Sequence, residues 1–193
     1  HGNDARGLVG LSIGGNGGVY TDNQFTVINV GSDTSGTGAT GGTIALTADA
    51  ASRIATHGAH SHAVHLYSAG GVAGTADGGF AFINTADLAG GAGGSGGTVD
   101  VKGAVVTQTY GDYALGGLYQ SIAGGGGDVS TQSDSSGLFV LGGSGGQGGK
   151  GGAVKLGANL TAATEGGAAP GVQAQSIGGG GGNGGNANGV VAV

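Results

Sequence analysis

The sequence predicts an all-β protein in which repeated segments stack as a parallel β-solenoid. Gly accounts for 53 of the 193 residues, against about 7% in an average protein. The glycines recur at a fixed spacing, which indicates a repeat fold rather than a flexible coil. Short apolar runs between them alternate with polar residues, as half-buried strands do. Helix is disfavoured because the chain holds a single Glu and no Met, and because Gly recurs about every ten residues.

Composition excludes several other classes. A single Pro rules out a collagen triple helix, and the absence of Cys removes disulfides and thiolate metal sites. A net charge of −6 with few basic residues predicts no binding to nucleic acid, and the lack of any run of about 18 apolar residues predicts no insertion of this segment into a membrane as a helix. The 37% of hydrophobic residues argues against disorder. Because the chain starts at His1 with neither an initiator Met nor a signal peptide, we expect a segment of a longer protein.

The repeat unit is about 55 residues long. Gly41-Gly42, Gly96-Gly97 and Gly151-Gly152 each precede an apolar strand and are 55 residues apart. A second landmark is a serine before an isoleucine, at Ser12, Ser121 and Ser176, where the first spacing is 109 and suggests one deletion. We therefore predict one unit over residues 1–193, with repeats at about 3–58, 59–112, 113–167 and a partial 168–193.

Each copy is expected to hold about four short strands. In the first copy these are Leu8–Ile13, Phe25–Val30, Thr43–Ala48 and Ser52–Thr56. Such strands bury a face only when copies stack, so Ile44, Val99 and Val154 should form one interior column. Two long glycine runs, Gly142–Gly152 and Gly178–Gly185, exceed what a corner needs. They are either protruding loops or extended polyglycine-type strands.

The string Gln175-Ser176-Ile177 followed by Gly178–Gly185 carries a resemblance, together with Ala169–Ala174 before it. It resembles the glycine-rich repeat in passenger regions of large bacterial autotransporters and related surface adhesins. Ala114–Gly127 and Ala5–Gly18 match more loosely, and Ala59–Gly79 departs from the pattern. The resemblance implies a right-handed β-helix exported through an outer-membrane barrel encoded further along the gene. It also implies a place outside the bacterial cell and a role in adhesion, aggregation or scaffolding.

The candidate metal ligands are four histidines close together in the sequence: His57, His60, His62 and His65. Neutral imidazole binds Zn, Ni or Cu, but the other copies hold no His at these positions. The alternative is an exposed loop that gains positive charge in acid. We predict no metal and no cofactor, and retain the four histidines only as weak metal candidates.

Two motifs resemble catalytic or nucleotide-binding sites. Gly10–Gly14 fits the strained turn that exposes a hydrolase serine, Ser12, and Gly36–Gly41 fits a dinucleotide fingerprint. No helix pattern follows either motif. Serines also recur at the position of Ser12 in later copies, as a feature of the repeat. We expect the Asp residues to cap turns. The sequence therefore predicts no catalytic residue and no enzyme.

Three functions remain open from the sequence. The first is a structural and adhesive segment of a surface protein, whose partners are its own neighbouring repeats and an unidentified glycan or protein. The second is a subunit that self-associates into an extracellular fibre. The third is a ligand-binding face: an ice-binding row at Thr43, Thr47, Thr98 and Thr107, or a glycan patch. The tyrosines that would serve a glycan patch, or pack in the core, are Tyr67, Tyr110, Tyr113 and Tyr119.

Overall fold

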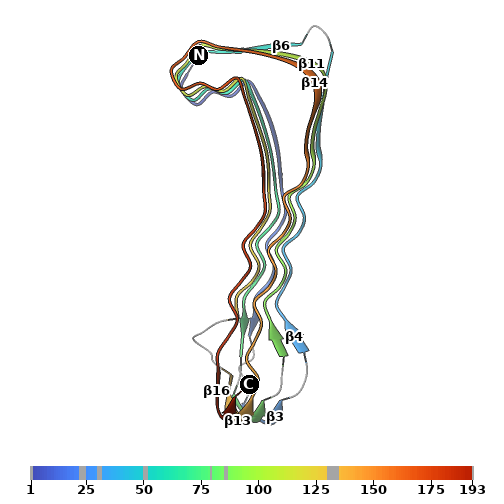
Figure 1. The fold of residues 1–193 in the computed structure, drawn as a ribbon, viewed down its shortest axis with the longest axis vertical. Helices are drawn as coiled ribbons and strands as arrows, with labels where there is room; N and C mark the ends of the chain where they lie inside the picture. The colour runs from blue at the N-terminus through green and yellow to red at the C-terminus, as the bar shows by residue number, and fades with distance from the viewer. Residues whose placement is uncertain are drawn as a thin grey trace.

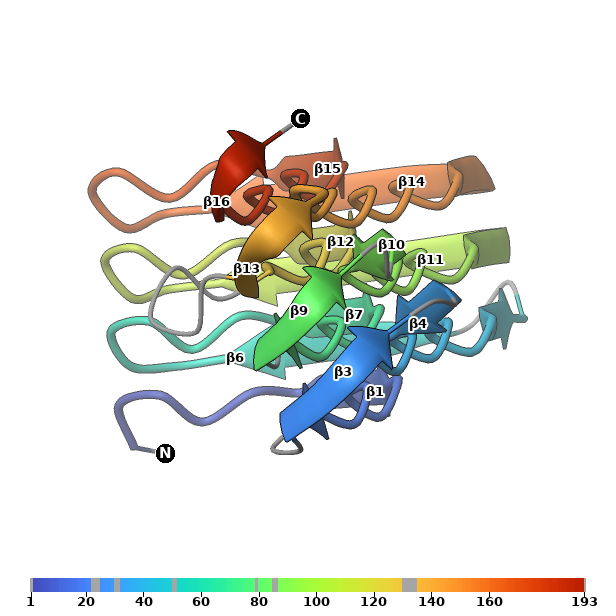
Figure 2. The same cartoon turned by 90° about the horizontal axis from the view of Figure 1, so that it is seen from below.

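The computed structural model describes residues 2–21, 25–29, 32–49, 52–78, 80–84, 87–129 and 135–192. Within these residues the protein is all-β and holds no helix. Seen down the stack, the paths of the four copies run side by side around one elongated outline (Figure 1). Seen from below, the copies lie one above the other, from the first in blue to the last in red (Figure 2).

The four strands expected in the first copy all form, together with two short strands that the sequence did not predict, Tyr20–Thr21 and Ser32–Thr34. Leu8–Ile13 forms as predicted, Thr43–Ala48 begins one residue later and Ser52–Thr56 also begins one residue later. The strand expected at Phe25–Val30 is described as far as Asn29, and Val30 lies outside the described residues. The strands are β1 (Leu8–Ile13), β2 (Tyr20–Thr21), β3 (Phe25–Asn29), β4 (Ser32–Thr34), β5 (Ile44–Ala48), β6 (Arg53–Thr56), β7 (Val64–Ala69), β8 (Ala76–Asp77), β9 (Phe80–Asn84), β10 (Asp87–Ala89), β11 (Val99–Thr109), β12 (Gly117–Ile122), β13 (Ser135–Val140), β14 (Val154–Thr164), β15 (Val172–Ile177) and β16 (Ala187–Ala192).

Within the described residues, every sheet joins equivalent strands of successive copies, and every strand pairing is parallel. The orders are β1-β7-β12-β15, β5-β11-β14 with β6 also on β11, β3-β9-β13-β16, β2-β8 and β4-β10. Val99 pairs with Ile44 on one side and with Val154 on the other. The predicted column of residues fifty-five apart is therefore confirmed.

The serine landmark is in register through all four copies. Ser12 pairs with Ser68, Ser68 with Ser121, and Ser121 with Ser176. The spacing from Ser12 to Ser68 is one residue longer than the repeat unit, and the spacing from Ser68 to Ser121 is two residues shorter. Together the two changes give the single deletion that the sequence suggested. Because the register absorbs both changes, the second copy stacks as well as the others.

The main hydrophobic core lies between the sheet of β1, β7, β12 and β15 and the sheet of β5, β11 and β14. Its buried residues are Val64, Leu66, Val99, Val101, Val105 and Tyr119. Asp100 and Lys102 of β11 face outward, as predicted, and Lys102 Nζ lies 3.1 Å from Asp100 Oδ2 in an ion pair. The inward side chains of these paired strands thus form the core, whereas β1 also exposes Val9, Leu11 and Ile13 on its outer side.

Below this core the glycine runs form extended tracts bonded at every third residue. The N–H groups of Gly14, Gly17 and Tyr20 donate to the second copy, to the carbonyl oxygens of Ala69, Val72 and Thr75. A period of three is that of the polyproline II conformation, which polyglycine also adopts. We call residues 14–20, 70–76, 123–129 and 178–184 the forward tracts, and residues 35–41, 90–96 and 145–151 the return tracts.

Forward and return tracts bond to each other in a zigzag. Gly71 donates its N–H to Ala39 O at 2.8 Å, and Gly94 donates to Gly71 O at 2.9 Å. The series continues through Gly124, whose N–H reaches Gly94 O at 2.8 Å. The stacked forward tracts form one wall and the stacked return tracts form the other, and both walls appear as wavy traces in the middle of Figure 1. Of the two sequence alternatives for the long glycine runs, polyglycine-type strands are therefore correct.

Close approach, rather than unusual backbone angles, explains most of the glycine. A Cβ on Gly71 would overlap the carbonyl of Gly15, and a Cβ on Gly124 would overlap that of Gly71. Among the described glycines, only Gly58 and Gly103 have positive φ. Close backbone approach therefore accounts for the glycines of the tracts.

One serine replaces a direct bond between the tracts. The buried hydroxyl of Ser35 accepts the N–H of Gly91 at 2.7 Å and donates to the carbonyl of Gly74. The hydroxyl therefore satisfies both backbone groups that would otherwise bond to each other directly. Beyond the tracts, Tyr20 packs against a smaller core of Ala76, Leu88 and Val129, which is followed by the sheet of β3, β9, β13 and β16.

Candidate functional site

The candidate site is the corner that precedes β1, β7, β12 and β15. It begins at Gly2, Gly58, Gly111 and Gly166 in successive copies, whose backbones lie in close contact. Two residues further on, Asp4, His60, Tyr113 and Ala168 all have φ between 50° and 60°. This left-handed conformation costs a non-Gly residue about 1–2 kcal/mol. Equivalent side chains of neighbouring copies therefore leave the corner in the same direction and form columns.

Two of these columns hold aromatic pairs. The rings of His57 and Tyr110 stack with centroids 4.5 Å apart and an interplanar angle of 17°. His60 and Tyr113 stack at 5.1 Å and 8°. Tyr110 is 39% exposed and Tyr113 54% exposed, whereas Tyr119 is 1% exposed in the core. The preferred expectation that the tyrosines pack in the core is thus right for Tyr119 and wrong for these two.

Of the other two histidines, His65 lies on β7, on the face turned away from the core, and His62 lies two residues before that strand. The backbone N–H of Leu115 donates to Nδ1 of His62 at 3.0 Å, so the neutral ring carries its proton on Nε2. His65 Nε2 lies 3.3 Å from Oε1 of Gln120. Nε2 of Gln120 in turn donates to Oε1 of Gln175 at 2.6 Å. A polar ladder therefore crosses the second, third and fourth copies.

Arg6 lies beside these imidazoles. The N–H of Gly7 donates to the carbonyl of His62 at 3.0 Å, which places the segment of Arg6 directly against that of His62. Burial lowers the pKa of His62 below its ordinary 6.5, and the charges of His65 and Arg6 lower it further. Burial also lowers the pKa of His65, again with a contribution from Arg6. Nδ1 of His65 is buried without a hydrogen-bond partner.

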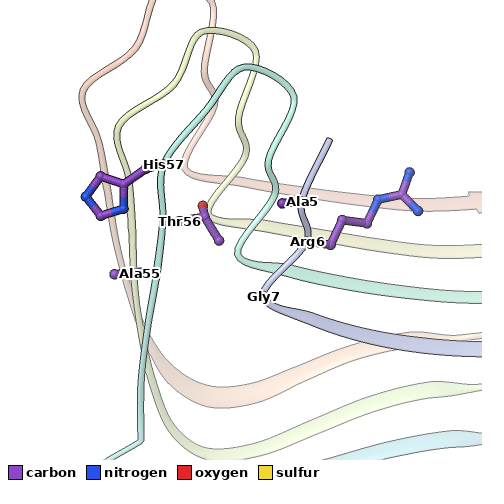
Figure 3. A pocket seen from close by; sticks show the side chains of 6 residues that line it. All are labelled: Ala5, Arg6, Gly7, Ala55, Thr56 and His57. Carbon is purple, nitrogen blue, oxygen red and sulfur yellow. The ribbon is translucent and has the colours of Figure 1, made fainter. Parts of the chain in front are cut away.

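A small open pocket of about 230 Å³ lies beside the corner at the first copy. It is lined by Ala5, Arg6, Gly7, Ala55, Thr56 and His57. In Figure 3 the side chains of Arg6 and His57 point away from each other, to opposite sides of the pocket.

The four predicted metal candidates do not form one cluster. His57 and His60 each stack on a tyrosine, while His62 and His65 meet edge to face at 6.2 Å. Across the described parts of the chain, no group of three or more His, Asp or Glu side chains is placed to hold a metal ion. The structure thus places the rings of His62 and His65 against each other, whereas the other two rings each contact a tyrosine.

The motif residues occupy repeat positions of the framework. Ser68 and Ser121 donate their hydroxyls to the carbonyls of Gly42 and Gly97, both at 2.8 Å. Ser12 accepts the N–H of Gly42 at 2.8 Å in the same ladder. The segment Gly36–Gly41 lies in a return tract, with no helix following it among the described residues. A dinucleotide fingerprint needs that helix.

The expected threonine row is not one surface. Thr43 and Thr47 are exposed, but Thr107 is buried at 4% exposure. Thr107 lies after β11 has turned at Gly103, where φ is 88°, and its side chain is directed inward. The ice-binding row that the sequence suggested is therefore wrong in this form.

Sequence reasoning missed Arg6 as a site residue and used Gln120 and Gln175 only as repeat landmarks. The repeat spacing of 55 residues joins Gln120 to Gln175, which pair in register, whereas His65 pairs with Leu118 and reaches Gln120 two residues further along. No protein-family model matches the chain, and comparison with curated proteins and with solved structures gives no significant match. Within the described residues, no helix has the length and apolar character to cross a membrane.

Proposed function

We propose that this chain is a rigid segment of an extracellular surface protein, in which a continuous β-solenoid extends the molecule and presents a surface for adhesion. The observation that carries the proposal is the hydrogen bonding of the tracts. Successive forward tracts bond to each other, as where Gly70 donates to Ile122 O, and the neighbouring residue Gly71 bonds across to Ala39 O of a return tract. Bonding in two directions at every third residue stiffens a backbone that would be flexible alone.

The sequence resemblance to bacterial autotransporter passengers supports the location at the cell surface. The framework has the properties that such a place demands. It holds no Cys and therefore does not depend on redox conditions. Its repeated bonding leaves few backbone groups of the inner tracts open to a protease. We assign no catalytic chemistry, since the recurring serines bond to the backbone of the framework.

Mechanical unfolding of the whole chain tests the rigid segment. The two ends are tethered and pulled apart in a single-molecule trap. We expect steps of about 190 Å, which is the extended length of fifty-five residues at roughly 3.5 Å each. Smooth extension at low force, without steps, would show that the copies are not cooperative units and would contradict the proposal.

Surface exposure tests the location separately. Intact cells that produce the protein containing this chain are treated with an external protease and probed with an antibody against residues 1–193. Loss of the signal from intact cells supports the proposal. A signal that disappears only after lysis would place the chain inside the cell and refute the surface role.

A fibre subunit is the second candidate function, favoured by the edges of the stack. In the described residues, β1 and β15 end their sheet and each bonds to one neighbour only. Free edges of this kind can pair with a further chain. Electron microscopy of the purified chain separates the candidates, because isolated particles of fixed length support the first and continuous filaments support the second.

A further inference from the structure

We propose that the hydrogen bond between His62 and Leu115 is a proton-sensitive contact: in mild acid the ring releases the backbone N–H, and the corner of the third copy opens away from the second while the tracts stay bonded. This inference goes beyond the proposed function and does not depend on it, because it concerns how one junction of the stack responds to acid. The two residues lie in the segments that precede β7 and β12.

The first argument is that the second copy holds Leu115 through both of its backbone polar groups. The N–H of Leu115 donates to Nδ1 of His62 at 3.0 Å, and its carbonyl oxygen accepts the N–H of Ala63 at 3.0 Å. Leu115 is buried, with 8% of its surface exposed. A buried N–H that loses its acceptor destabilises the structure around it. The closed corner therefore depends on the imidazole as an acceptor.

The second argument is that only the neutral ring of His62 makes this bond. A neutral imidazole accepts at one nitrogen, whereas a protonated imidazole donates from both nitrogens. Because Nδ1 is the nitrogen that accepts from Leu115, it is also the nitrogen that takes up a further proton. Protonation therefore sets an N–H of the ring against the N–H of the backbone. The two groups repel each other, and the corner has to move away from the charged ring.

The third argument is that the equivalent positions in the other copies are built without this bond. The register of β1, β7, β12 and β15 aligns Arg6, His62, Leu115 and Pro170. Pro170 has no N–H and needs no acceptor. The N–H of His62 itself donates to the carbonyl oxygen of His60 at 3.2 Å, which does not titrate. The proton-sensitive contact thus belongs to the junction of the second and third copies and is not a feature of the repeat.

The charged and titratable groups around His62 come from all three neighbouring copies. Those that act on its ring are His65, Arg6, His60 and Asp4, and the corner of Asp112 and Tyr113 in the third copy bonds to the backbone of His60. Burial has the largest effect and lowers the pKa of His62 below its ordinary 6.5. The charges of His65, Arg6 and His60 lower this pKa further, whereas Asp4 raises it.

The lowered pKa sets the direction of the response. When the corner opens, the ring of His62 returns to water and its pKa returns towards 6.5. The open corner therefore binds a proton more readily than the closed corner, and a fall in pH below 6.5 favours opening until the closed form is protonated as well. The tracts are held by bonds that do not titrate, such as that of Gly124 to Gly94 O at 2.8 Å. Opening is thus confined to the corner.

Amide hydrogen exchange of the wild-type chain tests the contact. Protection factors, which remove the intrinsic effect of pH on exchange, are measured between about pH 7.5 and about pH 5, on either side of the ordinary imidazole pKa. We expect the protection of the Leu115 N–H to fall by up to about tenfold for each pH unit below 6.5. A protection factor that stays constant over this range would overturn the proposal.

The effect of urea on exchange shows whether the opening is local. Local openings expose little surface, so low concentrations of urea hardly change them, whereas global unfolding becomes steeply easier. At about pH 5 the exchange of Leu115 should be nearly independent of urea, and the exchange of Gly124 in the tract should rise with it. An equally steep rise at Leu115 would show that the amide is released only when the whole stack unfolds, and would refute a local opening.

Matched variants assign the response to one ring. His62→Asn keeps an acceptor that does not titrate, so the Leu115 N–H should stay protected at both pH values. His62→Leu removes the acceptor and should give low protection at both. The control is His57→Asn, which removes a ring that stacks on Tyr110 and should keep the wild-type pH dependence. Dependence that survives in His62→Asn, or that disappears in His57→Asn, would overturn the assignment to His62.

Discussion

Ser121 donates its hydroxyl to the carbonyl oxygen of Gly97 at 2.8 Å, and so joins the end of β12 to the opposite wall of the molecule. The hydroxyl oxygen of Ser121 in turn accepts the N–H of Gly152 at 2.8 Å. One hydroxyl therefore satisfies two backbone groups where the hydrophobic core gives way to the glycine tracts. Ser68 makes the equivalent bonds with Gly42 and Gly97.

Removing the Ser121 hydroxyl should destabilise the protein. Ser121→Ala leaves buried backbone groups of Gly97 and Gly152 without partners, and we expect a loss of about 1–3 kcal/mol in the free energy of unfolding. Urea unfolding measures it. The matched control is Ser176→Ala, at the exposed equivalent position in the last copy, which should change stability by less than about 0.5 kcal/mol. Equal effects would contradict the ladder.

A methyl group in the tracts should be tolerated only where no neighbouring backbone approaches. Gly124→Ala places a Cβ against the carbonyl of Gly71 and should cost about 2 kcal/mol or more. Gly180→Ala meets nothing within 4 Å and should be nearly neutral. Thermal unfolding of both variants compares them. If the two substitutions have similar effects, close approach does not explain the glycine content.

The corner should become more stable when its strained residue is replaced by Gly. Ala168 has a φ of 50°, and relief of about 1–2 kcal/mol of strain exceeds the entropic cost of Gly. We expect Ala168→Gly to raise stability by about 0.5–1 kcal/mol. The control Ala169→Gly, at a position without positive φ, should lower it by a similar amount. A loss in both variants would argue against the left-handed corner.

Stability should fall in mild acid because of His62 and His65. Burial lowers the pKa of both rings below 6.5. Between the folded and the ordinary pKa the unfolded chain therefore binds more protons than the folded one. The free energy of unfolding decreases as the pH falls through this window. Urea unfolding across the window measures the decrease, which His62→Gln should reduce. A profile identical to wild type would show that His62 is not responsible.

Much of the framework could be predicted because each copy carries the same apolar pattern at the same spacing. The apolar residues Ile44, Val99 and Val154 align at one spacing, and alternation then fixes which face they occupy. The register of the second copy was harder to predict from the sequence, because one longer spacing and one shorter spacing nearly cancel between Ser12 and Ser121. The tract conformation stayed open because Gly itself carries no directional side-chain pattern.

The site was less predictable than the framework. Its histidines are close in sequence, which suggested one cluster, but the chain turns at His60 and directs the rings to different surfaces. Arg6 lies in another copy, and only the register shows that it adjoins His62. A lone Arg has no periodic signal that would have identified it.

The three-residue period of the tracts has a consequence for how their surfaces vary. Two positions in each turn face neighbouring backbones, and the third points to solvent, as at Val72, Ala92 and Gln147. Outward positions along one tract are about 9 Å apart at a rise of 3.1 Å per residue. Substitution there leaves the glycines that hold the walls together untouched. The exterior is thus a grid whose chemistry can diversify while the scaffold beneath it stays constant.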